Sequence, residues 1–526
     1  MTTQLFSHMP GGDSAHEKIG RPLSWILERY GKRMRDNPKM VSSLARQLGR
    51  SRNLIECFHS VGWSMTLQDA KWMIDRMAAM GTNFYNFHAF FYTIGGLTKH
   101  DAPPSQFLQN PYWKHFRQLG DYTGRISYLM STGTADIRIA VLDPTTTFWS
   151  LMGNPLHGFE YSGEDEAERA RLERLTNDWM RIGVHLLENR RDYDHLDPEL
   201  LAEAVITGGT IQIGAARYEV LILPPMMNLE ANAWKQVRRF AEQGGTVISV
   251  GLPPYISIQE GSPEGSEAAT FFGAGDQPEE EYWGHAGETR QASSELMWQQ
   301  GEGEVYFLPV GAGQGDDSTL ELISLLLDQV LPEPICWIME EESASLLMQT
   351  RQLSDGEYMV FLSNQEGQQL KGQLKVVAKR LWSHTDVSSD KRVLAERLNL
   401  ETGEREVLPL TSSGGEWCIS LGFAGYEAHA VRLTLQTKTS DDTFVAIGKT
   451  GAAASVKPDA ASMPSESVIL PVEGPWRLEA IQPNTLRMGQ FRLTATNDNG
   501  VILENKHAGV KPFIDQAAEL SGHHHL

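Results

Sequence analysis

A glutamate at the end of a short apolar run is the residue best suited to chemistry in this sequence. The run RNLIECF, residues 52–58, has the apolar character of a buried strand and carries Glu56 close to its carboxyl end. In a (β/α)8 barrel, the reacting groups project from strand ends at the carboxyl-terminal face. Hydrolysis of a glycosidic bond needs two carboxylates, one that protonates the leaving oxygen and one that activates water or attacks carbon. Glu56 fits one half of such a pair, but a solvated glutamate with no catalytic role has the same pattern.

The residues that follow Glu56 are suited to binding a sugar. They include His59 and Trp63, next to Cys57 and Phe58. Sugar sites commonly cover the apolar face of a pyranose with rings, while polar groups hold its hydroxyls. This segment therefore predicts His59 and Trp63 as substrate-binding residues.

A second histidine lies in the next candidate strand. The run TNFYNFHAFFY, from Thr82 to Tyr92, is predicted to be that strand, and it carries His88. Asn86 lies two residues earlier and shares the face of His88 if the strand is regular. A neutral imidazole at this place could bind a substrate hydroxyl or tune the pKa of Glu56. The alternative is a buried histidine packed among phenylalanines, here Phe84, Phe87, Phe90 and Phe91.

Further candidates lie before and after these two strands. A short candidate strand, QLFSH at residues 4–8, ends in His8, for which the same two interpretations hold. The loop after Tyr92 contains Asp101, Gln109 and Trp113, whose pattern fits both substrate contacts and ordinary loop packing. The candidate catalytic residues are thus Glu56 and His88, and the candidate substrate-binding residues are His8, His59, Trp63, Asn86, Tyr92, Asp101 and Trp113.

The first 132 residues must position these side chains, and they alternate between strand and helix. Helices are predicted at residues 38–48, 66–81 and 112–131. The second of these begins with a capping box of Thr66 and Asp69, and Gly81 ends it. Strand and helix that alternate within one domain predict a parallel sheet or a barrel.

The next unit, residues 133–331, reads as a doubly wound α/β domain. The buried-type strands IRIAVLDP, YEVLILPP and TVISVG alternate with two long helices. Residues 256–302 are rich in Gly, Glu and Ser and are interpreted as a long surface insertion. The glycine-rich GAGQGD at residues 311–316 lacks the Lys-Ser/Thr ending of a phosphate loop, so it is interpreted as a loop before a helix. We expect this unit to be a scaffold or an oligomerisation module.

The last part of the chain changes to β-structure. Short alternating strands over residues 332–438 predict a β-sandwich. Residues 439–466 are poor in large apolar side chains and are predicted to be a linker. Residues 467–526 begin a further β module, which the chain hardly has room to finish.

Composition excludes several classes of function. The chain has 526 residues, enough for several domains, with 46 Lys and Arg against 67 Asp and Glu, a net charge of −21. No stretch gathers basic residues as phosphate binding requires, and no apolar run approaches the ~20 residues that span a bilayer. We therefore expect no nucleic-acid partner and no membrane partner.

Cysteine spacing and the first residues add two further expectations. Cys57, Cys336 and Cys418 lie far apart and lack metal-ligand or redox spacing, so no metal and no cofactor are expected. A structural calcium is not indicated, because no acidic cluster demands one. The first residues lack the pattern of a secretory signal, which favours a cytoplasmic location unless an N-terminal part is missing.

The motifs of the first hundred residues resemble a known family. The large bacterial glycoside hydrolases related to family 106, the α-L-rhamnosidase-like enzymes, have a glutamate in an E-x-F-G-like motif, then a G-x-x-L-T helix and a G-V-N strand that ends in histidine. Here the first motif reads Glu56-Cys57-Phe58-His59, and the strand runs from Gly81-Thr82-Asn83 to His88. The match extends to about residue 250, and His59 replaces the usual glycine, which puts the local turn in doubt.

The resemblance implies an architecture and an activity. It implies the C-terminal part of a (β/α)8 barrel, then a flavodoxin-like or class I amidotransferase-like domain, then β-sandwich modules that include a sugar-binding jelly roll. The family's barrel glutamate corresponds to Glu56 and its strand-end histidine to His88. The implied activity is hydrolysis of terminal sugars with inversion, and the implied partner is a carbohydrate or glycoside.

The resemblance also places the start of this chain near the sixth barrel strand. Five strands, and the second carboxylate that they should carry, would then be absent. A three-strand piece has unpaired edges, so we expect aggregation, pairing with a complementary chain or a rearrangement.

Two other interpretations remain open at this point. One is a non-catalytic carbohydrate-binding or assembly protein, the remnant or fragment of such an enzyme. The other is a β-galactosidase-like enzyme, in which a barrel is followed by an amidotransferase-like trimerisation domain. The sequence leaves open whether the chain is a homo-oligomer.

Overall fold

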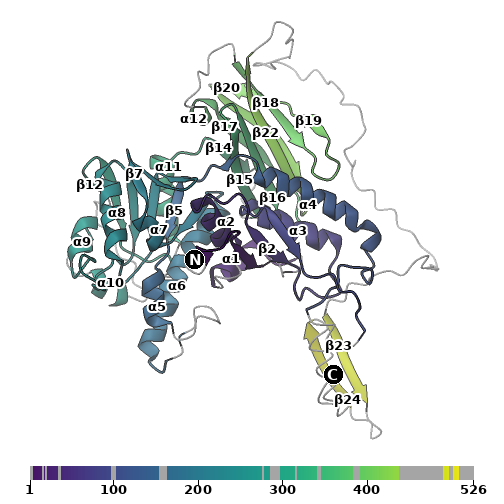
Figure 1. Ribbon diagram of the computed structural model, residues 1–526, viewed down its shortest axis with the longest axis horizontal. Helices are drawn as coiled ribbons and strands as arrows, with labels where there is room; N and C mark the ends of the chain where they lie inside the picture. Colours follow the sequence, from purple (N-terminus) through teal and green to yellow (C-terminus); the bar gives the residue numbers. More distant parts are fainter. Residues whose placement is uncertain are drawn as a thin grey trace, which may run out of the picture.

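The structure is a computed structural model of the chain. It describes residues 4–14, 17, 20–32, 37–95, 102–152, 161, 163–274, 278–284, 297–313, 317–339, 345–382, 391–413, 415–437, 490–496 and 502–508. Three units follow one another: a small parallel sheet with its helices in the centre of Figure 1, an α/β unit at the left and a β-sandwich at the top.

The first unit is a parallel sheet of three strands in the order β1-β2-β3. The strands are β1 (Gly11–Asp13), β2 (Leu54–Cys57) and β3 (Phe84–Phe87). Both neighbouring pairs are parallel, with Gly11 beside Leu54 and Leu54 beside Phe84. A Cβ at Gly11 would lie 3.3 Å from the carbonyl oxygen of Leu54, so the close approach of β1 to β2 favours glycine there.

Helices connect and cover these strands. They are α1 (Leu23–Lys32), α2 (Pro38–Gln47), α3 (Leu67–Ala79), the short 3-10 helix η4 (Trp113–His115) and α4 (Phe116–Ser131). The predicted capping box of α3 is confirmed, because the Thr66 side chain accepts from the Asp69 amide and the Asp69 carboxylate accepts from the Thr66 amide. Gly81 has a φ of 93° and ends the helix as predicted. Helix α1 was not predicted.

Two of the predicted strands are corrected. Residues 4–8 form no strand, because Gln4 lies in a turn and its side chain accepts from the Gly11 amide, while Phe6 is 90% exposed. The strand predicted from Thr82 to Tyr92 ends at Phe87. Its pairing with β2 stops there because the His88 amide donates to the Cys57 carbonyl and the chain then turns away, with the Ala89 carbonyl accepting from Gln106.

The α/β unit has a sheet of six strands in the order β12-β13-β11-β10-β5-β6. The parallel strands are β5 (Ile139–Leu142), β6 (Tyr193–Leu196), β10 (Val220–Leu223), β11 (Thr246–Val250) and β13 (Gly303–Leu308). Their spatial order, second, first, third, fourth and fifth, is flavodoxin-like. Strand β6, with the sequence YDHL, was missed because Asp194 and His195 interrupt its apolar pattern. All four of its residues are nevertheless buried.

Helices cover both faces of this sheet. Helices α6 (Glu166–Glu188) and α11 (Ser318–Val330) pack with Ile139 and Val141, and α8 (Ala231–Glu242) packs with Ala140 and Leu142 on the other face. The smaller elements are α5 (Thr145–Leu151), α7 (Pro198–Ala202) and the antiparallel sheet of β7 (Val205–Thr207), β8 (Thr210–Ile213) and β9 (Ala216–Tyr218).

The predicted surface insertion at residues 256–302 is partly wrong. It contains α9 (Glu267–Phe272), α10 (Pro278–Gly284) and the antiparallel edge strand β12 (Met297–Gln300). Phe272 and Tyr282 are buried, so these helices contribute to the core although their segment is rich in Gly, Glu and Ser. The GAGQGD segment is described as far as Gly313, and α11 begins at Ser318.

The third unit consists of two antiparallel sheets with a shared core. One contains β14 (Ile335–Met339), β17 (Leu370–Val377), β21 (Glu416–Phe423) and β20 (Thr411–Ser413). The other contains β19 (Arg405–Val407), β18 (Lys391–Leu398), β22 (Ala428–Thr437), β16 (Glu357–Asn364), β15 (Leu346–Ser354) and β4 (Thr134–Ala135). Helix α12 (Ala378–Leu381) follows β17. Because β4 directly follows α4, the first unit is joined to this sheet by backbone pairing.

After residue 437 the structure describes residues 490–496 and 502–508. The predicted linker at residues 439–466 lies outside the described residues, and from the predicted β module the structure describes the antiparallel hairpin of β23 (Gln490–Thr496) and β24 (Ile502–Ala508).

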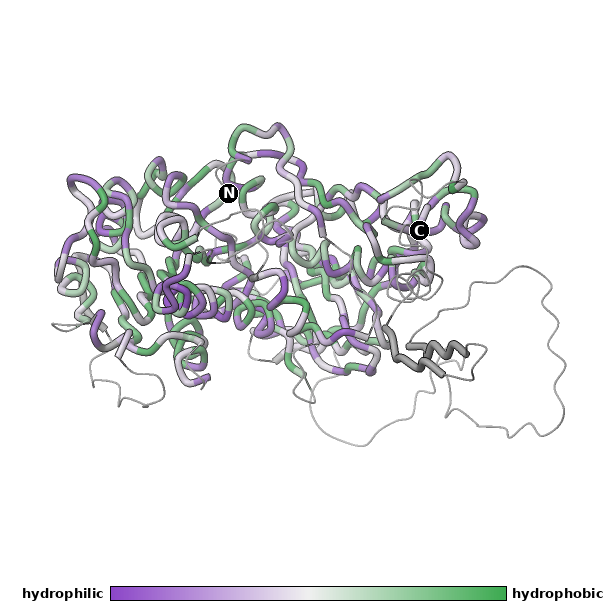
Figure 2. The backbone as a smooth tube through the Cα atoms, turned by 90° about the horizontal axis from the view of Figure 1, so that it is seen from below, coloured by the Kyte–Doolittle hydropathy of each residue, from purple (hydrophilic) through white to green (hydrophobic). Residues whose placement is uncertain are grey.

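Side chains from all three units contribute to one hydrophobic core. Trp72 of α3, Trp179 of α6 and Phe361 of β16 belong to the same buried cluster. Among the described residues, no helix has the length and apolar character needed to cross a bilayer. Figure 2 shows hydrophobic and hydrophilic residues interspersed along the chain.

The first unit and the α/β unit are held together by buried charges. The Arg46 guanidinium of α2 binds the Asp194 carboxylate of β6, with Nε to Oδ2 at 2.7 Å. The Lys39 ammonium lies 2.5 Å from Asp192, and Tyr218 also donates to Asp194. Both aspartates are buried or nearly so, so this contact fixes α2 against β6.

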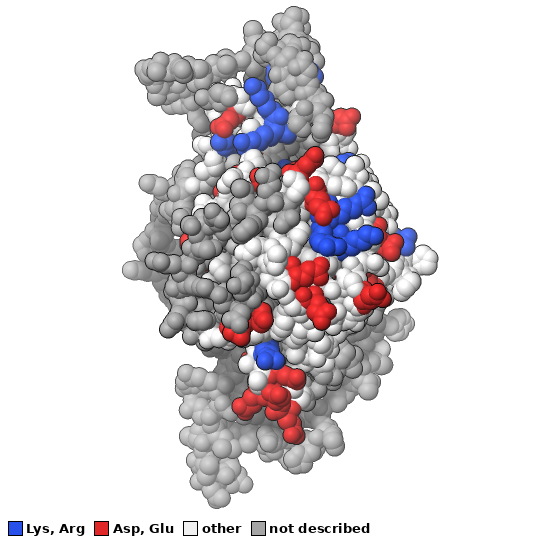
Figure 3. Space-filling model, turned by 90° about the vertical axis from the view of Figure 1, so that its left-hand side faces the viewer, with Lys and Arg blue, Asp and Glu red and all other residues white. Residues whose placement is uncertain are grey.

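The surface charge of the α/β unit is mixed. On the side shown in Figure 3, described acidic and basic side chains form small separate groups, with no broad basic surface among them.

Candidate functional site

Three polar side chains form a row across the small parallel sheet. The strand registers place Asp13 beside Glu56 and Glu56 beside Asn86. Side chains at matching positions of parallel strands project from the same face. Ile55 and Cys57 are buried on the opposite face, whereas Glu56 is half-buried and Asn86 is exposed. The row therefore lies on the accessible face, close to the carboxyl ends of β1, β2 and β3.

Asp13 was missed by the sequence analysis. It ends a three-residue strand, GGD, whose two glycines give no apolar pattern. The aspartate after this glycine pair was the available signal, but its neighbour Glu56 could be identified only from the strand register. Asp13 supplies a second carboxylate where the sequence predicted none.

The turn after β2 adopts an unusual backbone that the resemblance did not predict. Phe58 and Ser60 have positive φ values of 78° and 58°, whereas His59 between them does not. Phe58 is buried against Phe87, with ring centroids 4.8 Å apart. The turn is therefore made with the left-handed conformation on either side of His59, and a glycine at position 59 is not needed for it.

The structure brings His59 and His88 together beside the row. Their ring centroids are 4.9 Å apart in an edge arrangement. The His88 amide donates to the Cys57 carbonyl at 2.8 Å, which fixes His88 next to the end of β2. Nδ1 of His88 is buried and makes no hydrogen bond with the described residues. The two imidazoles are therefore paired at the carboxyl end of β2.

The packing alternative for His88 receives partial support. Its ring contacts Phe91 at 5.9 Å between centroids, but the side chain of His88 is only half-buried. Phe84 and Phe90 are 43% and 50% exposed, so they do not enclose it in a core.

Trp113 belongs to an aromatic cluster in the loops after β3. Its ring stacks on Phe116 at 5.8 Å and meets Phe107 and Phe90 edge-on at 5.1 and 6.5 Å. Loop packing therefore accounts for Trp113, which keeps part of its surface accessible.

The other predicted binding residues are scattered. His8 is exposed and precedes the amino end of β1, so it lies away from the strand ends that carry the row. Tyr92 is 92% exposed in the loop after β3, and Trp63 is half-buried in the turn before α3. Asp101 lies outside the described residues.

A buried ion pair supports the sheet from its other side. Arg76 of α3 binds Glu17 at 2.6 Å and donates to the Tyr30 hydroxyl at 3.0 Å, with all three side chains buried. Cys57 faces this side, where burial raises the pKa of its thiol far above the ordinary value. Cys57 is therefore an inert core residue and not a nucleophile.

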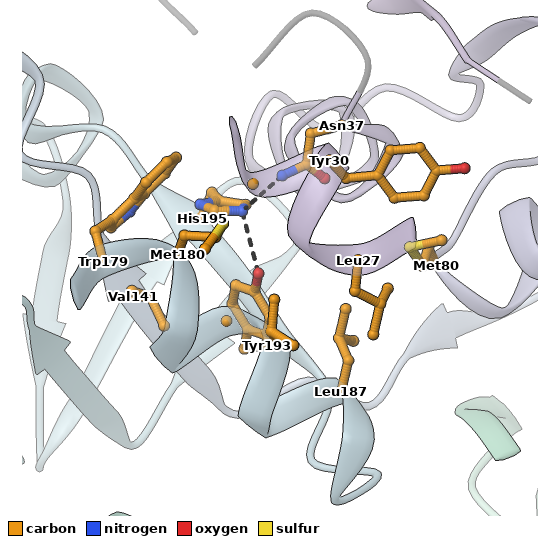
Figure 4. Close-up of a pocket in the computed structure, with 13 residues that line it drawn as sticks. Leu27, Tyr30, Asn37, Met80, Val141, Trp179, Met180, Leu187, Tyr193 and His195 are labelled. Carbon is orange, nitrogen blue, oxygen red and sulfur yellow. Dashed lines mark hydrogen bonds between the residues drawn. The ribbon is translucent and has the colours of Figure 1, made fainter. Parts of the chain in front are cut away.

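The α/β unit contains a buried pair of a histidine and an aspartate that the sequence did not predict. His195 of β6 and Asp143 after β5 are 2.8 Å apart, and Nε2 of His195 lies 3.2 Å from the Tyr193 hydroxyl and 3.4 Å from the Asn37 amide nitrogen. Figure 4 shows His195 at the wall of a pocket between α1 and α6. The pocket holds about 20 Å³, room for about one water molecule, so we interpret these contacts as structural.

Among the described residues, no group of three or more His, Cys, Asp or Glu side chains is arranged to hold a metal ion.

Two comparisons of the sequence with known proteins found no relative. No protein-family model matches the sequence. A search of curated proteins found no match.

Solved structures do match. A rhamnosidase from Novosphingobium sp. PP1Y matches with a TM-score of 0.55 and 17% identity, over 85% of this chain and 36% of that chain. Two β-galactosidases match at TM-scores of 0.49 and 0.48. Gan42B, a GH42 enzyme from G. stearothermophilus, is 14% identical over 80% of this chain and 58% of its own. The enzyme from Bacillus circulans sp. alkalophilus is 13% identical over 79% and 59%.

The chain matches these proteins over only part of their own length. The chain spans about a third of the rhamnosidase and less than two thirds of either β-galactosidase. The match to the rhamnosidase has a TM-score above 0.5, and at 17% identity it shows similarity of fold alone.

Proposed function

We propose that this chain provides a glycoside hydrolase site that acts on terminal sugars, with Glu56 as a catalytic carboxylate. The preferred candidate substrates are α-L-rhamnosides. The observation that carries the proposal is the row of Asp13, Glu56 and Asn86 on the accessible face of the parallel sheet. The resemblance in the first hundred residues and the fold shared with a rhamnosidase support the choice of sugar.

Asp13 is the second carboxylate in this proposal. Neighbouring strands lie roughly 4.8 Å apart, which brings the backbones of Asp13 and Glu56 close together, while the separation of the two carboxylates also depends on their side-chain conformations. Retaining glycosidases hold their carboxylates about 5 to 5.5 Å apart and inverting ones about 6.5 to 9.5 Å. For two carboxylates on neighbouring strands we propose retention, in contrast to the inversion that the resemblance implies.

Each residue of the row has a role in this chemistry. The Glu56 carboxylate attacks the anomeric carbon, while the Asp13 carboxyl gives its proton to the leaving oxygen. Water then breaks the bond from sugar to Glu56 and returns a proton to Asp13. The Asn86 amide and the imidazoles of His59 and His88 bind sugar hydroxyls.

The test is hydrolysis of a panel of aryl glycosides, led by the α-L-rhamnoside and including the β-galactoside. Glu56→Gln and Asp13→Asn should each lower kcat by about 10²- to 10⁴-fold, because each removes a group that acts in the transition state. Asp355→Asn is the matched control, since Asp355 is an exposed carboxylate in the sandwich. Turnover that survives in both row variants would refute the assignment.

The carbohydrate-binding alternative has one observation in its favour. The described barrel-like sheet has three strands, and β1 and β3 are its edges. A folded sample that binds the rhamnoside without hydrolysing it, and that keeps its affinity in Glu56→Gln, would establish this second function. The same sample should then be tested for pairing with a complementary chain, because edge strands are open to pairing.

A further inference from the structure

A second cavity lies at the junction of the three units, at the end of the parallel sheet opposite to Glu56. It has a volume of about 260 Å³. Its walls include Asn53 and Asn83, which directly precede β2 and β3, together with Arg46 and Arg50 at the end of α2 and Arg351 of β15. The cavity is thus polar and rich in arginine, and it is separate from the proposed catalytic row.

Arg351 is a buried cation at this cavity. The residue is 7% exposed, and its guanidinium donates to the carbonyls of Thr132 and Gly133, each at 3.0 Å. Among the described residues, no carboxylate forms an ion pair with it. Burial and the nearby Arg46 lower the pKa of Arg351 to about 10, and Asp192 offsets this only in part, so the side chain stays charged at neutral pH. Burying a charge without a direct ion-pair partner is costly, so an anion in the cavity would stabilise it.

The other cations near the cavity differ in whether a carboxylate pairs with them. Arg46 is already neutralised by Asp194, and Lys39 by Asp192. Arg50 is exposed at the cavity and, like Arg351, has no carboxylate partner among the described side chains. Among the residues that line the cavity, three arginines face one carboxylate, Asp194, so a surplus of two positive charges, 3 − 1, remains there.

Asn53 adds a hydrogen-bond acceptor. It is 4% exposed, its amide nitrogen donates to the Gly81 carbonyl at 2.9 Å, and its backbone amide donates to Asn83. Its side-chain oxygen is buried and accepts no hydrogen bond from the described residues. A buried acceptor of this kind calls for a donor such as a hydroxyl group.

We propose that this cavity binds a small organic oxyanion that also carries hydroxyl groups, with Arg351 and Arg50 beside the phosphate or carboxylate and Asn53 accepting from a hydroxyl. The site is made by all three units, so an occupied cavity would hold them together. The proposal does not rest on the proposed hydrolase activity, because the cavity lies at the other end of the sheet.

The experiment measures binding to the full chain by calorimetry and by thermal shift at constant ionic strength. Glucose 6-phosphate and gluconate are the charged probes, and glucose is the neutral probe. We expect at least one charged probe to bind and to raise Tm, and the tighter of the two identifies the anionic group. Glucose should do neither.

Two variants and a control decide where the probe binds. Arg50→Gln should weaken binding by about fivefold, as expected for one exposed charge. Arg351→Gln should weaken it by about tenfold or more, because a buried charged hydrogen bond is lost. Arg117→Gln, which removes an exposed arginine on α4, should have no effect.

Two results would overturn the proposal. One is the absence of binding by either charged probe at up to about 10 mM, which would mean that Arg351 serves only to hold α4 against the sandwich. The other is an equal loss of affinity in Arg50→Gln and Arg117→Gln, which would show a general charge effect. If Arg351→Gln does not fold, Arg50→Gln still decides, since the Arg50 side chain is exposed.

Discussion

Replacing Asp194 of β6 by asparagine should destabilise the protein far more than the same change at Asp192, which directly precedes that strand. Asp194 accepts from Arg46 at 2.7 Å, from Tyr218 at 2.8 Å and from Ser43 at 3.1 Å. Asp192 has one close cation, Lys39 at 2.5 Å. Asparagine preserves the shape at both positions and removes the charge.

The two carboxyls differ in the direction of their pKa shifts. Burial by itself raises the pKa of Asp194, but Arg46 and Lys39 outweigh it and leave the pKa below the ordinary 3.8. Burial raises the pKa of Asp192, and Lys39 does not fully offset it. The charge on Asp194 therefore stabilises the fold at neutral pH more than the charge on Asp192 does.

The size of the effect follows from the burial of Arg46 against Asp194. Removing one partner of a buried ion pair costs roughly 3 to 5 kcal/mol, because the other charge is left uncompensated. At about 2 to 4 °C per kcal/mol for a unit of this size, Asp194→Asn should lower Tm by about 6 to 20 °C. Asp192→Asn should cost much less, since Lys39 still has Asp194 at 3.8 Å.

Urea denaturation followed by tryptophan fluorescence, with hydrogen exchange of α2, would measure this difference. The wild type should lose stability as the pH falls below 3.8 through the pKa of folded Asp194, and Asp194→Asn should lose less over the same range. Equal costs for the two variants, or a cost below about 1 kcal/mol for Asp194→Asn, would refute the reasoning.

Three further predictions concern other contacts. Gly31→Ala should destabilise the fold by about 1 to 3 kcal/mol in denaturant titrations, because its Cβ would lie 2.0 Å from Met180 where α1 meets α6; an unchanged midpoint would contradict this. Tyr122→Phe should cost about 1 to 3 kcal/mol, since the buried Asp75 carboxyl loses a hydrogen bond, and a Tm equal to that of the wild type would be the contrary result. Burial lowers the pKa of His185 below 6.5, so stability should fall as the pH drops below 6.5, and His185→Gln should reduce that slope in urea midpoints measured from pH 7 to 5.

Local patterns in the sequence predicted much of the secondary structure. The helix from Leu67 to Ala79 was predicted from its capping box, its apolar stripe and its terminal glycine, all of which act within a few residues. The run around Glu56 was identified as a strand for the same kind of reason. Where the pattern was weak, as in GGD and in YDHL, strands β1 and β6 were missed, because their hydrogen bonds and burial depend on neighbours far away in the chain.

The candidate site shows the same division. Sequence alone identified Glu56, His59 and His88 as a carboxylate and two imidazoles near strand ends. Only the tertiary structure decided that Asp13 lies beside Glu56, because strand register joins residues that are 43 positions apart, 56 − 13. Likewise, the charge on Arg351 became informative only once folding had buried it without a carboxylate at the junction of three units. The sequence by itself shows residue types and the local spacing of apolar residues, whereas long-range strand register and burial are determined by tertiary packing.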